Sequence, residues 1–244
     1  MNKAFVVSDI HGMYGHFIKL LEHWNRDDKL IILGDMIDRG PDSLKVIQHV
    51  MELKANHDVI VLQGNHDQMI KDFVKDPLEH GELYTYHNGG GPTIHSLAQE
   101  GARIYYMSNL EKAELIKQKC KQEIEFLEQG RLYYEFGKVL FTHAGFCSWR
   151  DCWEETTDNQ FVWIRDHYKH KNNTGLVNVF GHTPTQLINK DKSNDIWVSE
   201  DKTYIGIDGA CAYGGQLNGI LINENGELLD SYNIRVLDNN KIRN

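Results

Sequence analysis

The segment Leu30-Ile31-Ile32-Leu33-Gly34-Asp35-Met36-Ile37-Asp38-Arg39-Gly40 leads from an unbroken apolar run straight into charged residues. The same pattern occurs on either side of it. Ala4-Phe5-Val6-Val7 precedes Ser8-Asp9-Ile10-His11-Gly12, and Val59-Ile60-Val61-Leu62 precedes Gly64-Asn65-His66-Asp67. Short continuous apolar runs are typical of strands that are buried on both faces. The three runs therefore predict three parallel strands of one sheet, each ending in polar residues.

Segments with apolar residues at helical spacing separate these runs. Residues 15–24 form one such segment, a second helix is expected to begin at Pro41-Asp42-Ser43, and a third from about Gln68. Strands that alternate with helices predict an α/β fold, with a parallel sheet covered on both faces.

The strongest break in the chain is Asn88-Gly89-Gly90-Gly91-Pro92. Residues 109–129 beyond it predict one long helix, with Leu110, Ile116, Ile124 and Leu127 facing inward. We expect a single domain over residues 1–244, with a helical cap inserted at about 92–130. Strand character returns in five further runs, at residues 132–134, 138–141, 176–180, 203–206 and 219–222. The last run is expected to pair antiparallel with 228–236, and the polar segment 188–202 predicts a solvated connection rather than a substrate loop.

Length and composition exclude several classes of protein. The chain of 244 residues has 41% hydrophobic and 25% charged residues, which is ordinary for globular proteins and argues against disorder. A net charge of −9 disfavours nucleic-acid binding. No apolar run approaches the ~20 residues that span a bilayer, and the apolar N-terminal stretch is too short for a signal peptide. Four dispersed cysteines predict neither a disulfide framework nor a thiolate zinc site, so a reducing cytoplasm is the expected location.

Potential metal ligands follow five of the predicted strands. Because the carboxyl ends of strands form the ligand-binding edge of an open α/β sheet, these side chains are expected to meet there. The candidates are Asp9, His11, Asp35, Asn65, His143 and His182. Taken singly, an Asp after a strand is more often a helix cap, and a lone His is more often an ordinary core or surface residue. Their common position at strand ends favours a metal site, and nine other histidines are assigned no such role.

The ligand types indicate which metals fit. Oxygen and imidazole ligands without thiolate suit manganese, iron or zinc rather than calcium, and Mn²⁺ is our first expectation. Six ligands exceed what one catalytic ion with open positions needs, so two divalent ions are expected. A carboxylate can bridge two ions about 3.5–4 Å apart, and Asp35 is the candidate bridge.

The three strand-end motifs, followed by two later single histidines, resemble those of the calcineurin-like metallophosphoesterases. Within that family they resemble the phosphoprotein phosphatase branch, and above all the bacterial and phage-lambda-type serine/threonine protein phosphatases and the related diadenosine tetraphosphatases. The resemblance extends over nearly the whole chain, through Asn88-Gly89-Gly90, Trp163-Ile164-Arg165, Gly181-His182-Thr183-Pro184 and Ile207-Asp208-Gly209-Ala210. It implies a βαβ core in which mixed sheets form a sandwich flanked by helices, with the helical segment as a cap.

The resemblance also implies roles for these residues. One ion would take Asp9, His11 and Asp35, and the other would share Asp35 and add Asn65, His143 and His182. A hydroxide between the ions would attack phosphorus in line. Arg39, Arg165 and Asn65 would hold the phosphoryl group. The alternative is that Arg39 is an ordinary surface turn residue and that Arg165 forms a salt bridge on a helix face. His66 would protonate the leaving oxygen, and Asp38 would orient His66 and favour its imidazolium form.

Three functions remain open at this point. The first is a serine/threonine protein phosphatase that hydrolyses phosphomonoesters in phosphorylated proteins or peptides. The second is a symmetrical diadenosine tetraphosphatase acting on dinucleoside polyphosphates. Asp67 favours it weakly, because the protein phosphatases usually have Glu at this position. Ser8 replaces the Gly that is more common in the family, and we expect this difference to be harmless. The third is a non-catalytic scaffold for phosphorylated partners. Tyr84, Tyr86, Tyr105 and Tyr106 either stack an adenine or pack the cap.

Overall fold

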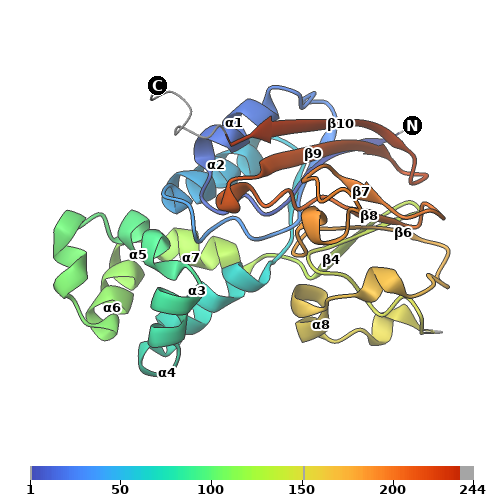
Figure 1. Ribbon diagram of the computed structural model, residues 1–244. Coiled ribbons are helices and arrows are strands. Elements are labelled where there is room, and N and C mark those ends of the chain that lie inside the picture. The colour runs from blue at the N-terminus through green and yellow to red at the C-terminus, as the bar shows by residue number, and fades with distance from the viewer. Residues whose placement is uncertain (1, 151, 237–244) are drawn as a thin grey trace.

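Two five-stranded sheets form the centre of the protein, of which the computed structural model describes residues 2–150 and 152–236. The first sheet has the order β10-β9-β1-β2-β3 (Figure 1). Its strands are β1 (Lys3–Val7), β2 (Lys29–Ile32), β3 (Val59–Val61), β9 (Gln216–Asn223) and β10 (Leu228–Arg235). As predicted, β1, β2 and β3 are parallel, and β9 and β10 pair antiparallel at one side.

The second sheet has the order β4-β5-β6-β8-β7. Its strands are β4 (Tyr133–Phe136), β5 (Val139–Thr142), β6 (Val177–Phe180), β7 (Trp197–Val198) and β8 (Tyr204–Gly206). The central strands β5, β6 and β8 run parallel, and β4 and β7 are antiparallel edges. The segment 188–202 is therefore not purely a solvated connection, because Trp197 and Val198 in it pair with β8.

The two sheets pack face to face, which confirms the predicted α/β sandwich of mixed sheets. Val6 and Ile31 of the first sheet share a buried cluster with Phe141 and Val179 of the second. The opposite face of the first sheet is covered by α1 (Tyr14–Leu21) and α2 (Ser43–Asn56) (Figure 1). Both faces of β1 to β3 are thus buried as expected, but a second sheet rather than helices covers one of them.

A helical segment connects β3 to the second sheet. It comprises α3 (Asn65–Lys75), α4 (Pro77–Glu82), the π-helical turn η1 (Leu83–His87), α5 (Gly90–Ala98), the 3₁₀ turn η2 (Gly101–Tyr106), α6 (Asn109–Lys119) and α7 (Lys121–Glu128). The expected single helix over 109–129 is wrong, since the backbone leaves helical geometry at Cys120, whose thiol donates to the Leu97 carbonyl at 3.2 Å. Residues 109–129 therefore form two helices instead of one. Leu110 of α6, which was expected to face inward, is 55% exposed, whereas Lys112 is buried.

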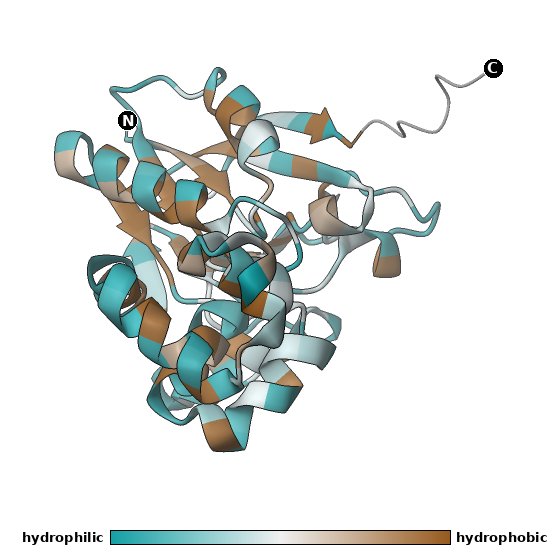
Figure 2. Cartoon of the chain, turned by 90° about the vertical axis from the view of Figure 1, so that its left-hand side faces the viewer, coloured by the Kyte–Doolittle hydropathy of each residue, from teal (hydrophilic) through white to brown (hydrophobic). Residues whose placement is uncertain are grey.

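The remaining elements are short. They are α8 (Asp158–Trp163) and the 3₁₀ turns η3 (Trp153–Glu155), η4 (His167–Lys169), η5 (Thr185–Leu187) and η6 (Cys211–Tyr213). Figure 2 shows apolar residues on the strands and on one side of the surrounding helices, as burial against a sheet requires. All four cysteines are free thiols. In the described part of the chain no helix combines the length and apolar character needed to cross a membrane.

Candidate metal site

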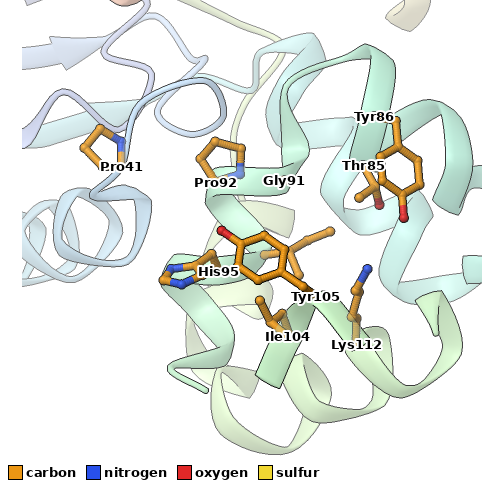
Figure 3. A pocket seen from close by; sticks show the side chains of 10 residues that line it. Pro41, Thr85, Tyr86, Gly91, Pro92, His95, Ile104, Tyr105 and Lys112 are labelled. Carbon is orange, nitrogen blue, oxygen red and sulfur yellow. The ribbon is translucent and has the colours of Figure 1, made fainter. Parts of the chain in front are cut away.

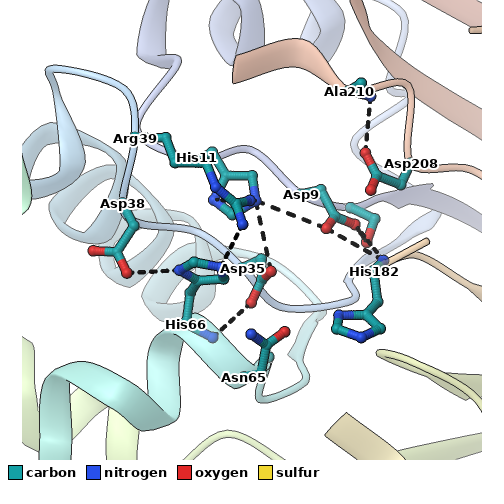
Figure 4. A network of polar contacts seen from close by, with 12 residues as sticks. Asp9, His11, Asp35, Asp38, Arg39, Asn65, His66, His182, Asp208 and Ala210 are labelled. Atoms are coloured by element: carbon teal, nitrogen blue, oxygen red, sulfur yellow. Dashed lines mark hydrogen bonds and ion pairs between the residues drawn. The ribbon is translucent and has the colours of Figure 1, made fainter. Parts of the chain in front are cut away.

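The six predicted metal ligands meet at one rim of the sandwich, where the strands end. Asp9, Asp35 and Asn65 follow β1, β2 and β3 of the first sheet, and His143 and His182 follow β5 and β6 of the second. Each of the six is at least 94% buried, and Figure 4 shows five of them around a common centre. Residues that lie 173 positions apart in the chain are thus in direct contact, since the His182 N–H donates to Asp9 Oδ2 at 3.0 Å.

The backbone at this rim is strained. The left-handed region of φ, which is unfavourable for residues other than glycine, is occupied by Asp9, His11, Asp35, Asp38, Arg39 and His182, with φ between +48° and +72°. Such residues cost about 1–3 kcal/mol each and persist only where the surrounding structure holds them. Here the loops hold one another, because the His11 N–H donates to the Asp35 carbonyl at 2.9 Å and the Gly12 N–H to the Met36 carbonyl at 2.9 Å. This convergence of sharp turns directs the side chains inward.

Asp35 lies between two histidines that belong to different strands. Its Oδ2 is 3.6 Å from His11 Nε2, and its Oδ1 is 3.5 Å from His143 Nε2. Two groups of side chains have ligand atoms close enough to hold an ion, His11 with Asp35 and His66, and Asp35 with His143 and His182. Asp35 is the member they share. Burial, followed by the charges of Asp9 and Asp67, raises the pKa of Asp35 well above its ordinary value, so the ionised carboxylate requires a nearby cation.

The histidines are oriented by backbone carbonyls. His11 Nδ1 donates to the Ile37 carbonyl at 2.7 Å, and His143 Nδ1 donates to the Leu33 carbonyl at 2.9 Å. Because the Nδ1 atoms carry the protons and burial lowers the pKa of both imidazoles, each Nε2 presents a lone pair. His143 Nε2 faces the Asn65 side-chain oxygen at 3.0 Å, so that two acceptors face each other. Within residues 2–150 and 152–236, the buried His182 Nε2 has no hydrogen-bond partner.

These observations test whether the residues fit a metal. Several buried acceptor atoms face the centre of the site without a hydrogen-bond donor, and the Asp35 carboxylate is shared by two groups of side chains. A cation at the centre would satisfy these oxygen and nitrogen atoms. The set contains oxygen and nitrogen but no thiolate, which is the chemistry of manganese, iron or zinc. The residues therefore fit divalent metal binding.

Arg39 brings a positive charge to the edge of this donor set. Its guanidinium contacts His11 Nε2 through Nη1 and donates to His66 Nε2 through Nη2 at 2.7 Å. Its backbone N–H donates to the Gly89 carbonyl at 2.8 Å, and the guanidinium lies 4.9 Å from the centre of the Tyr213 ring. The guanidinium is thus held at the site rather than extended into solvent, as binding of a phosphoryl group there requires.

Arg165 is exposed and contacts the loop that follows β6. Its Nη1 donates to the His182 carbonyl at 3.3 Å and to Thr183 Oγ1 at 3.4 Å. These contacts attach it to the loop that carries a predicted metal ligand. The alternative of an ion pair on a helix face does not apply, because Arg165 lies beyond the end of α8 at Trp163.

His66 and Asp38 form a hydrogen-bonded pair. His66 Nδ1 donates to Asp38 Oδ2 at 2.7 Å, and the Tyr84 hydroxyl donates to Asp38 Oδ1 at 2.7 Å. Burial raises the pKa of Asp38 to about 7, while burial and the Arg39 charge lower the pKa of His66 to about 2. Asp38 thus accepts from His66 Nδ1, whereas burial and the Arg39 charge work against the expected imidazolium form. An anion bound to Arg39 would offset that charge and favour protonation of His66.

The four tyrosines considered for stacking divide into two kinds. Tyr84 is buried, stacks on Phe73 with ring centres 5.2 Å apart, and orients Asp38 as described. It is therefore a positioning residue, which its sequence context did not indicate. Tyr86, Tyr105 and Tyr106 are 68%, 76% and 90% exposed.

Two further buried carboxylates belong to the site, although the sequence analysis gave them no role in it. Asp208 follows β8 and accepts the Ala210 N–H at 2.8 Å (Figure 4). Burial and the neighbouring charge of Asp9 raise its pKa well above the ordinary value. The signal was available, because Asp208 follows a predicted strand as the other ligands do. Asp67 lies in the first turn of α3 and accepts the backbone N–H groups of Gly64, Asp35 and Met36 at 3.0, 2.8 and 3.2 Å.

We predict that Asp67→Ala lowers the free energy of unfolding by about 3 kcal/mol, because it leaves buried N–H groups of the Asp35 loop without acceptors. Urea denaturation of the metal-free protein measures this. Asp67→Asn keeps one acceptor oxygen and is expected to cost less. A loss below 0.5 kcal/mol for Asp67→Ala, the range of about ±0.5 kcal/mol typical of surface substitutions, would contradict the bracing role.

The sandwich and its rim of buried oxygen and imidazole ligands define a metal-dependent phosphoric ester hydrolase. Residues 3–214 match the family model of the calcineurin-like phosphoesterases, and the chain belongs to that family. The resemblance noted in the motifs is thereby confirmed at the level of the family.

Relatives with described activities include the asymmetrical bis(5′-nucleosyl)-tetraphosphatase of Anoxybacillus flavithermus. It is 26% identical in an alignment that covers 88% of this chain and 88% of the relative. Similar solved structures include a proposed diadenosine tetraphosphatase (18% identity, TM-score 0.65, 97% and 95% of the two chains). Another is a serine/threonine phosphatase of Saccharomyces cerevisiae (12% identity, TM-score 0.62, 97% and 81%). At these identities the two structures show a common fold alone.

Proposed function

We propose that this enzyme hydrolyses a phosphoanhydride bond of dinucleoside polyphosphates such as diadenosine tetraphosphate. The observation that carries the substrate class is the similarity to a bis(5′-nucleosyl)-tetraphosphatase along 88% of both chains. The observation that carries the reaction is the buried donor set around Asp35, with Arg39 at its edge. This proposal reverses the order expected from the motifs, in which the protein phosphatase came first.

The chain's own residues have distinct tasks in this reaction. Two divalent ions, Mn²⁺ being our first choice, would be held by Asp9, His11, Asp35, Asn65, His143 and His182 and would activate water and offset phosphoryl charge when bound. Arg39 and Arg165 bind the oxygens of the attacked phosphoryl group from two sides, assisted by the Asn65 amide. A planar guanidinium can donate to two of these oxygens at once.

His66 protonates the leaving oxygen. Its Nε2 faces the Arg39 guanidinium at 2.7 Å, so that a phosphoryl group bound to Arg39 lies within reach of the same atom. The bound anion offsets the Arg39 charge and thereby raises the pKa of His66 from its low value. Asp38 accepts from Nδ1 and keeps the imidazole in the orientation in which Nε2 points at the substrate.

Hydrolysis of phosphoserine and phosphothreonine is the second candidate function. It is favoured by Asp38 and Arg39, because these two residues match the corresponding motif of the protein phosphatases that the sequence resembles. The third candidate is a scaffold that binds phosphorylated partners without turnover. The bracing of His66 by Asp38 and Tyr84 disfavours it, because binding alone has no use for an oriented proton donor.

A single assay panel separates the three functions. The Mn²⁺-reconstituted enzyme is incubated with diadenosine tetraphosphate, phosphopeptides and p-nitrophenyl phosphate, and products are separated by chromatography. We expect the dinucleotide to have the highest kcat/KM, and the products to identify the bond cleaved: AMP with ATP for asymmetrical cleavage, or ADP alone for symmetrical cleavage. A higher kcat/KM for phosphopeptides would instead support the protein phosphatase. Absence of turnover at confirmed metal occupancy would support the scaffold.

A further inference from the structure

A cavity of about 500 Å³ opens in the helical segment, between η1, α5, η2 and α6 (Figure 3). It is lined by Pro41, Thr85, Tyr86, Gly91, Pro92, Ile94, His95, Ile104, Tyr105 and Lys112. Its size falls within the range of small-molecule sites, and its walls are mostly apolar with few polar groups, as in such sites. The roles assigned so far to the metal ligands, arginines and His66 do not use it.

Flat side chains border this cavity. Tyr105 is 76% exposed and lies near His95, with ring centres 6.1 Å apart and planes inclined by 38°. Tyr86 borders another part of the cavity and is 68% exposed. Exposed tyrosine rings beside proline and isoleucine offer faces on which another aromatic ring stacks.

Lys112 supplies the cavity with a positive charge. Its side chain is 94% buried, and its ammonium lies 5.9 Å from the centre of the Tyr86 ring, towards which it points in Figure 3. Among the interactions found in residues 2–150 and 152–236, no hydrogen bond or ion pair involves Lys112 Nζ. The Lys112 side chain is thus largely covered, and its ammonium borders the cavity without a protein acceptor in the described residues. It can therefore donate to an acceptor atom of a ligand in the cavity.

The cavity adjoins the phosphoryl-binding loop. Pro41 is two residues beyond Arg39, and Gly91 is two residues beyond Gly89, whose carbonyl accepts the Arg39 N–H. Two residues span at most ~7 Å of chain. Helix α5 is also bonded to that loop, because Thr93 Oγ1 accepts the Asp38 N–H at 2.8 Å. The loop that carries Arg39 and the wall of the cavity are thus connected through Pro41 and helix α5.

We propose that the cavity binds one purine base of the dinucleoside polyphosphate, an inference that rests on the proposed function. The base stacks on Tyr105, and a ring nitrogen of the purine accepts a hydrogen bond from the Lys112 ammonium. An aliphatic group would fill the apolar walls but leave the ammonium unpaired. A second phosphate would pair with Lys112 but leave the apolar and aromatic walls without a partner. A purine satisfies both parts of the cavity because it has flat faces and acceptors at its edge.

Two variants test this proposal, Tyr105→Ala and Lys112→Met. Tyr105 is exposed, so its replacement does not disturb folding, and methionine keeps the length of the buried lysine without its charge. The matched controls are Tyr106→Ala, next in the chain and 90% exposed, and Lys117→Met, which is exposed on the same helix α6. We expect each test variant to raise KM for diadenosine tetraphosphate about tenfold, in line with base stacking of about 1–3 kcal/mol, with kcat unchanged. Kinetics with p-nitrophenyl phosphate, which has no base, should stay unchanged in all four variants.

A second measurement does not depend on catalysis. The metal-loaded protein is titrated with adenosine, which has no phosphate, and binding is followed by saturation-transfer NMR. We expect wild type and both controls to bind, and Tyr105→Ala and Lys112→Met to bind about tenfold more weakly. Unchanged KM and unchanged adenosine affinity in both test variants would overturn the base site while leaving the proposed hydrolysis intact. Conversely, adenosine binding that depends on Tyr105 and Lys112, in an enzyme that does not cleave diadenosine tetraphosphate, would overturn the proposed function and keep the base site.

Discussion

Replacing Asp35 with alanine is expected to remove both metal ions and to lower kcat/KM by at least about 10³-fold. The carboxylate is the one member shared by the two groups of metal-ligating side chains, with its oxygens 3.6 Å from His11 Nε2 and 3.5 Å from His143 Nε2. Loss of metal removes several kcal/mol of charge stabilisation, and every 1.36 kcal/mol corresponds to a factor of ten in rate. Elemental analysis after gel filtration measures the metal content, and initial rates with p-nitrophenyl phosphate measure the activity.

The same measurements on Asp27→Ala provide the control, because that carboxylate is exposed and precedes β2, whereas Asp35 follows the other end of that strand. It should retain two ions and full activity. An Asp35→Ala protein that keeps two tightly bound ions would remove Asp35 from the bridging role. Loss of only one ion would assign Asp35 to a single metal and contradict the shared carboxylate.

Replacing His66 with asparagine is expected to lower kcat for diadenosine tetraphosphate about 10²–10⁴-fold while both metal ions stay bound. The reason is the position of His66 Nε2, which faces the Arg39 guanidinium, whereas its Nδ1 is taken by Asp38. Such a residue donates a proton and contributes little to metal affinity. Among phosphomonoesters the loss should be much larger for a phosphoserine peptide than for p-nitrophenyl phosphate, because an alkoxide leaving group needs protonation and a nitrophenolate needs little.

This comparison of leaving groups separates a proton donor from a structural residue. His57→Asn, at an exposed position just after α2, serves as the control and should leave both rates unchanged. Equal losses for the phosphoserine peptide and p-nitrophenyl phosphate would contradict the role of His66 as an acid. Loss of metal in His66→Asn would identify His66 as a ligand, a possibility that its proximity to His11 and Asp35 makes worth measuring.

Most of the fold and the six candidate metal ligands followed from local patterns. Strands β1, β2 and β3 were predictable because each is a short apolar run, and burial on both faces excludes polar residues from such strands. The ligands were predictable because each follows a strand, and the ends of parallel strands meet at one edge. The same reasoning could have predicted Asp208 as a site residue, because it too follows a strand. The sequence analysis named it only as part of a motif shared with the family.

The errors have a common physical cause, which is dependence on distant contacts. Nothing near Cys120 in the sequence marks a break, and the two helices separate there because their packing requires it. Trp197 and Val198 form a strand only because β8 offers an edge. Asp67 resembles an ordinary residue in a first helical turn, and its importance comes from N–H groups of Asp35 and Met36, more than thirty positions away.

The sequence by itself determined the class of fold, the set of metal-binding donor types and the family, because burial and strand ends are encoded in neighbouring residues. Tertiary structure alone decided that burial and Arg39 lower the pKa of His66, that Tyr84 orients Asp38, and that the largely buried Lys112 side chain lies at the wall of a cavity. A charged residue on a helix is normally exposed, so its sequence pattern cannot reveal such burial. Protonation states and cavities depend on which distant groups pack together, and only the folded chain brings those groups into contact.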